Sequence, residues 1–271
     1  MVKVEKPEDI RDTVESQKNI EQIILRLTKY AKEHNLKIHF FDEGNYFDSS
    51  SPLIHKDPSP IVEAFLMGIE SEEDFNQYID VCTGGLKDLA QPASQYNFWL
   101  KTKKFLLENH EGDVGKREKL LKRAEEALAK IDMDLVYIRG VFSKLISDGV
   151  VDPKGYKKCE DEAAIKECIQ ILYGDKKDQV GWTKTTFKKD IDIKKLLAIM
   201  ETRENISADF IFKDIEENHT DLNVITYGAS HKFKNNVRRF NTKTGQKIGL
   251  VRLSTISKET EERRKIEREV K

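Results

Sequence analysis

Long apolar runs, cysteines and net charge are all scarce in this sequence, and each shortage excludes a class of protein. No apolar run approaches the roughly 20 residues that a membrane-spanning helix needs, so we expect no membrane segment. The first residues, MVKVEKPEDIRD, are charged throughout and predict no secretory signal. The 47 Lys and Arg residues are balanced by 48 Asp and Glu residues, so no global field favours nucleic acid or a membrane.

The cysteine usage indicates a reducing compartment. The three cysteines, Cys82, Cys159 and Cys168, cannot all pair with one another, and none belongs to a CxxC motif. A disulfide framework or a zinc ribbon is therefore not expected, and buried free thiols are. We expect a cytoplasmic protein, with export as an effector by a route that needs no signal as the alternative.

The first part of the chain predicts one helix followed by one strand. Apolar residues at helical spacing predict a helix over 7–34, and residues 36–41 then alternate as a strand that ends at Asp42. The alternation places His39 on the face opposite Phe40, where we expect a structural histidine.

The middle of the chain, from about 60 to 220, is almost wholly helical in pattern. The expected helices are 71–82, 94–109, 116–131, 135–145, 159–173, 191–200 and 205–218. The short connection between 116–131 and 135–145 predicts an antiparallel helix hairpin.

β-Branched residues return near the end of the chain. They predict a strand over 222–227 and a last strand over 247–253, with a helix between them. Together these elements predict a predominantly helical α/β protein with a small, mainly parallel sheet and a large helical insertion. We expect one domain over 1–271, divided as follows: an α/β layer from 1–59 and 190–256, the insertion from 60–189, and a charged helix or tail over 257–271.

The strand over 222–227 ends in the sequence Gly-Ala-Ser-His. In open α/β sheets, ligands gather beyond the carboxyl ends of the strands. Gly228 allows a sharp backbone turn there, and His231 can titrate near neutrality, bind a metal or accept a proton. The alternative for His231 is a surface histidine at the start of the next helix.

The residues around this junction resemble one superfamily. Arg203 and Glu204 open a helix that contains Ala208, and the strand after that helix leads to Gly228 and His231. This order is similar to the C-terminal part of the superfamily of the erythromycin esterases, the ChaN haem-uptake lipoproteins, and the TraB and Tiki proteins. The sequence departs from it in three respects: Ser207 stands where the family has methionine, and both the family's first Gly-x-x-His motif and its second strand ending in Glu are absent before residue 36.

The resemblance implies a hydrolase fold, either active or catalytically lapsed. It makes His231 the acid–base or ligand residue, Arg203 an anion stabiliser, and Glu204 and Asp42 supporting carboxylates. A divalent metal ion is the cofactor that such a set could hold. Because the helix and strand have similar lengths, we expect Arg203 to lie level with Gly228. The alternative for Asp42 is a solvated acidic loop.

A second candidate site is the basic segment 232–252, which contains no acidic residue. Phe233 and Phe240 are interspersed among its cations, which are Lys232, Lys234, Arg238, Arg239, Lys243, Lys247 and Arg252. We expect Gly228, Lys234, Arg238 and Arg239 to bind an anionic ligand, with the two arginines holding a phosphate or a carboxylate. The alternative is a basic face that acidic helices neutralise.

Three classes of function therefore stay open. The first is the divergent hydrolase, acting on an anionic small molecule. The second is a phosphate-binding or nucleic-acid-binding protein that uses 232–252, although no zinc, helix-turn-helix or RNP motif supports it. The third is an effector or accessory protein that binds a protein partner through the helices of 116–148.

Overall fold

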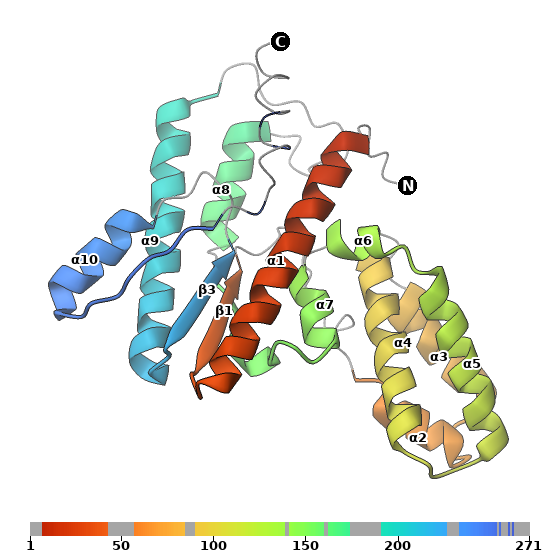
Figure 1. Ribbon diagram of the computed structural model, residues 1–271. Helices are drawn as coiled ribbons and strands as arrows, with labels where there is room; N and C mark the ends of the chain where they lie inside the picture. The colour runs from red at the N-terminus through yellow and green to blue at the C-terminus, as the bar shows by residue number, and fades with distance from the viewer. Residues whose placement is uncertain are drawn as a thin grey trace.

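The chain folds into a small parallel sheet between layers of helices, with a further group of helices to one side (Figure 1). The computed structural model describes residues 7–42, 57–84, 90–138, 141–159, 162–173, 191–226 and 233–253, together with Thr255, Thr260 and Glu262. Helices dominate these residues, and the predicted fold class is confirmed.

The sheet has three parallel strands in the order β2-β1-β3. They are β1 (Ile38–Asp42), β2 (Tyr156–Lys158) and β3 (Leu222–Thr226). Asp42, the last residue of the central strand, pairs in register with Lys158 on one side and Thr226 on the other. The carboxyl ends of all three strands therefore meet at the same edge.

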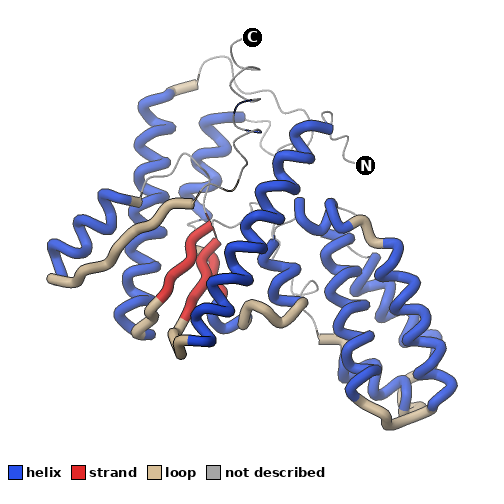
Figure 2. Tube along the Cα trace, in the orientation of Figure 1, coloured by secondary structure: helices blue, strands red, loops and turns tan. Residues whose placement is uncertain are grey.

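Helices cover both faces of the sheet, because the central strand is apolar on both sides. Phe40 faces α1 (Pro7–Glu33), α6 (Met133–Ile138) and α7 (Val141–Ser147). Phe41 faces the opposite layer, which contains α8 (Glu162–Tyr173) and α9 (Ile193–Asn218). Figure 2 shows the strands between these two layers. The result is an α/β/α sandwich.

A second group of helices packs around a core of its own, built on Phe65, Phe75 and Trp99. These helices are α2 (Ser59–Leu66), α3 (Glu72–Gly84), α4 (Ala90–Glu108) and α5 (Val114–Lys130). α4 also packs against α6 and α7, which connects this group to the sheet layers. One such contact is the hydrogen bond from Tyr96 Oη to Asp148 Oδ1 at 2.7 Å.

The predicted hairpin between 116–131 and 135–145 is wrong. α5 packs along α4 through the buried Leu120 and Ala124. The next segment is two short helices, α6 and α7, and its buried Val136 and Tyr137 belong to the layer beside α1. A short connection alone could not show that each helix buries its apolar stripe against a different neighbour.

The two helices predicted at 191–200 and 205–218 are one helix, α9. The polar residues from Thr202 to Asn205 resembled a helix start, but the sequence has neither Gly nor Pro there to end the preceding helix. The hydroxyl of Thr202 donates to the Ala198 carbonyl at 2.9 Å, so it is satisfied within the helix.

Strand β2 lies inside the range predicted as a helical insertion. It follows a short 3-10 turn at Pro153–Gly155 and has only three residues. A strand of three residues is too short to show an alternating pattern, so no periodicity predicted it.

The strand predicted over 247–253 is also wrong, because that segment joins no ladder among the described residues. It is extended and lies beside α10 (Lys234–Thr244), whose Asn241 side chain bonds both the N–H and the carbonyl of Ile248. The helix predicted before it is confirmed as α10, which ends at Gly245 with φ at +72°.

The chain returns to the first helix after this segment. Thr255 Oγ1 lies 2.7 Å from Ser16 Oγ, and Thr260 Oγ1 donates to Glu15 Oε2 at 2.8 Å. Residues 174–190 and most of the predicted tail over 257–271 lie outside the described residues.

All three cysteines are buried free thiols, as predicted. In the part of the chain that the structure describes, none of the helices has the length and apolar character needed to cross a bilayer.

Candidate functional site

The carboxyl edge of the sheet is the position where this topology builds a ligand site. The connection that follows β1 leads to α7 on one face, and the connection that follows β2 leads to α9 on the other. In parallel α/β sheets, a crevice opens between neighbouring strands whose connections leave in opposite directions. Asp42 ends the central strand at this point.

Two hydroxyl groups from the neighbouring strands hold the Asp42 carboxylate. Thr226 Oγ1 of β3 donates to Asp42 Oδ1 at 2.7 Å, and Tyr156 Oη of β2 donates to Asp42 Oδ2 at 3.3 Å. The two neighbouring strands therefore fix the orientation of the carboxylate.

The surroundings of Tyr156 favour its hydroxyl group as a hydrogen-bond donor. Its ring packs on Phe142 with the centroids 5.0 Å apart. Burial of the hydroxyl, together with the negative charge of Asp42, raises the pKa of Tyr156 above its ordinary value. The hydroxyl thus keeps its proton at neutral pH and can only donate to the carboxylate.

The backbone at the end of β2 is joined to Asp42 and to α9. The N–H of Cys159 donates to the Asp42 carbonyl at 3.3 Å, and Cys159 Sγ donates to the same oxygen at 3.5 Å. Ser207 Oγ of α9 donates to the Cys159 carbonyl at 2.7 Å. Ser207, which replaces the methionine of the resembled family, therefore fixes α9 against the carboxyl edge.

Arg203 lies one turn before Ser207, on the stripe of α9 that also carries the buried Ile211 and Asp214. α9 runs antiparallel to the strands, since its end is bonded to the start of β1 through the Lys37 side chain and the Asn218 carbonyl at 2.7 Å. Because Ser207 bonds the end of β2 and helical side chains lean toward the N-terminus, we expect Arg203 to lie beyond the strand ends. Arg203 belongs to the α9 layer, whereas the alternation along β1 turns the Asp42 side chain toward the other face of the sheet.

Of the other residues predicted for the site, the structure describes Glu204 but not Gly228 or His231. Glu204 is half-buried, on the side of α9 that turns toward α10, away from Asp42. Gly228 and His231 lie outside the described residues, in the segment that begins immediately after Thr226. The expected contact between Arg203 and His231 therefore stays a prediction.

A buried ionic cluster lies on the α9 face, nearer the amino ends of the strands. Asp214 Oδ2 accepts from His39 Nδ1 at 2.6 Å, and Asp214 Oδ1 accepts from Lys157 Nζ and from Asn218 Nδ2. His39 is thus a buried structural histidine, as predicted. The Asp214 carboxylate joins α9 to both β1 and β2.

The partners of Asp214 outweigh the cost of burying its charge. Burial alone would raise the pKa of Asp214, but the hydrogen bonds from Lys157 and His39 lower that pKa below its ordinary value. Asp214 is therefore ionised at neutral pH, and its role is structural.

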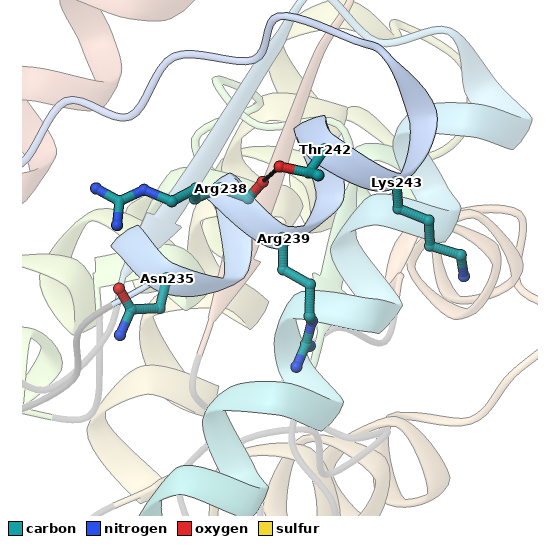
Figure 3. Close-up of a pocket in the computed structure, with 5 residues that line it drawn as sticks. All are labelled: Asn235, Arg238, Arg239, Thr242 and Lys243. Carbon is teal, nitrogen blue, oxygen red and sulfur yellow. Dashed lines mark hydrogen bonds between the residues drawn. The ribbon is translucent and has the colours of Figure 1, made fainter.

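The cations predicted to bind an anion lie on the exposed face of α10 (Figure 3). Arg238, Arg239 and Lys243 line a shallow depression there, together with Asn235 and Thr242. Arg239 lies 3.4 Å from Asp209 of α9. Figure 3 shows that Arg238 and Arg239 point in different directions, and the expectation that they hold one anion together stays a prediction.

Among the described residues, no three His, Cys, Asp or Glu side chains come together as metal ligands, so the suggested divalent metal gains no support from them. No protein-family model, no curated protein and no solved structure matches the chain. The resemblance to the esterase superfamily therefore stays an expectation that depends on a few motifs.

Sequence reasoning missed Tyr156, Thr226 and Cys159. Thr226 could have been found by aligning the ends of the two predicted strands, because their final polar residues are in register. Tyr156 and Cys159 could not, because they belong to β2 and its end, in a range predicted to be helical.

Proposed function

We propose that this protein is a hydrolase of small anionic substrates, with its site at the carboxyl edge of the sheet. The observation that carries the proposal is the Asp42 carboxylate, which two strand hydroxyl groups orient at the switch point of a parallel sheet. Carboxylates fixed at such positions are suited to general acid–base chemistry.

Asp42 acts as the base in this proposal. A water molecule attacks the carbonyl carbon of the substrate, and its proton passes to the Asp42 carboxylate. The proton then passes to the leaving oxygen as the carbon–oxygen bond breaks, which restores Asp42. The hydroxyl groups of Thr226 and Tyr156 keep the carboxylate from rotating during both transfers.

Arg203 supplies positive charge at the same edge. Its position one turn beyond Ser207 suits a guanidinium that holds a carboxylate of the substrate or stabilises the developing oxyanion. His231, in the segment after Thr226, is the second acid–base group that the resemblance implies.

The test is a hydrolysis screen of chromogenic carboxylic and phosphate esters with wild-type protein and Asp42→Asn. The asparagine keeps an oxygen that can accept from Thr226 but cannot take a proton, so we expect a loss of at least about 100-fold in kcat. The melting temperature should stay nearly unchanged.

Asp80→Asn is the matched control, because Asp80 is an exposed carboxylate on α3 in the separate helical group. It should keep full activity. An Asp42→Asn protein as active as wild type on every hydrolysed ester would overturn the proposal, as would a wild-type protein that hydrolyses none of them.

A further inference from the structure

α10 has two faces of opposite character. One face is anchored: Phe240 stacks on Phe212 of α9 with the centroids 4.2 Å apart, and Asn236 Nδ2 donates to Asn205 Oδ1 at 2.7 Å. The rest of the helix surface is exposed and carries Lys234, Arg238, Arg239 and Lys243. The apolar stripe is therefore occupied by the protein itself, and the cations face outward.

The exposed charge is largely uncompensated. Lys234, Arg238 and Lys243 form no ion pair with any described residue, and Arg239 has only the exposed Asp209 at 3.4 Å. A surface pair of this kind contributes at most about 1 kcal/mol, so an incoming anion can replace it. In a chain whose charges otherwise cancel, this helix is a local cationic surface.

The cations of α10 spread along the helix and over about half of its circumference. Lys234 and Lys243 are nine residues apart, which is about 13 Å along a helix axis and about half a turn around it. The same length of duplex DNA carries about eight phosphate charges. Asn235 and Thr242 lie among the cations and add hydrogen-bonding groups to the same depression (Figure 3).

We propose that α10 is a docking surface for duplex DNA, held through the phosphate backbone without dependence on base sequence. A single strand is disfavoured because Phe240, which could stack on a base, is already stacked on Phe212. An anionic membrane is disfavoured because the apolar stripe of α10 is buried against α9 and cannot insert.

This function is independent of the proposed hydrolase site, since it uses none of that site's residues. The test is fluorescence anisotropy of a labelled duplex with the full chain, over salt concentrations from about 50 to 200 mM. Four phosphate contacts predict a slope of log K against log salt of about −3.6.

The decisive variant is Arg238→Gln with Lys243→Gln. It should weaken binding at low salt by about tenfold or more and bring the slope nearer to zero by about 2. The matched control is Lys119→Gln with Lys122→Gln, which removes two exposed cations from α5 and should leave both quantities unchanged. Arg238→Lys with Arg239→Lys keeps the charge and should retain binding.

Four results would overturn the inference. The first two are absence of binding at the lowest salt concentration and binding that salt does not weaken. The third is a loss of affinity in the α5 control equal to that in the α10 variant. The fourth is tighter binding to a single strand or to phosphatidylserine vesicles than to the duplex.

Discussion

At the scale of single residues, Asp214 has the largest predicted effect on stability. Its carboxylate is 2% exposed and accepts hydrogen bonds from His39, Lys157 and Asn218. Removing one partner of a buried ionic cluster leaves the others without compensation, which typically costs about 3–5 kcal/mol. The cluster joins α9 to two strands, so its loss affects the whole α9 layer.

Asp214→Ala should therefore lower the free energy of unfolding at pH 7 by about 3 kcal/mol, measured by urea denaturation. Because the pKa of Asp214 is lower in the folded state, its ionic contribution is complete above about pH 4 and is lost as the pH falls through the folded-state pKa. The difference in the free energy of unfolding between wild type and Asp214→Ala should therefore become smaller below about pH 4.

Asp209→Ala is the control for this prediction, because Asp209 lies on the same helix but is 72% exposed beside Arg239. Asp209→Ala should lower the free energy of unfolding by less than about 1 kcal/mol at any pH. The role given to the buried cluster would be contradicted if both variants lost the same free energy of unfolding. It would also be contradicted if the difference between wild type and Asp214→Ala grew at acid pH.

At the scale of elements, the aromatic contact of Phe240 holds α10 on α9, together with the hydrogen bond between Asn236 and Asn205. Phe240 is 8% exposed and stacks on Phe212, and the only charged contact that the described residues give α10 is the surface pair of Arg239 and Asp209. The helix is short and ends at Gly245, so its own propensity is weak.

Phe240→Ala should accordingly destabilise the protein by about 3 kcal/mol. Amide hydrogen exchange should become faster in α10 than in α4, which has no contact with it. Thr242→Ala on the exposed face should change stability by less than about 0.5 kcal/mol. Unchanged exchange in α10 of the Phe240→Ala protein would show that the stack does not anchor the helix.

Some helices and strands could be predicted from sequence patterns, and others could not. β1, β3, α1 and α10 were predicted because each is long enough to display its period or is bounded by clear end signals. Residues 247–253 alternate as a strand should, yet they pack beside α10, because alternation does not say whether a partner strand is available.

At the scale of the whole molecule, the site depends on a topology that only partly follows from the sequence. Two predicted strands with polar final residues were enough to suggest an edge that includes Asp42. The third strand, which contributes Tyr156, was not predicted, and without it the switch point cannot be located. Right-handed connections between parallel strands then place the helices that follow β1 and β2 on opposite faces.

The central claim is that an anionic ligand binds at the carboxyl edge beside Asp42. Titration with phenylphosphonate, an anionic mimic of a tetrahedral intermediate, followed by amide chemical shifts, tests this claim most directly. We predict that the largest shifts fall on Asp42, Cys159 and Thr226, which are hydrogen-bonded to one another at that edge, and on Arg203 of α9. Shifts confined to α10, with none at the carboxyl edge, would contradict the account.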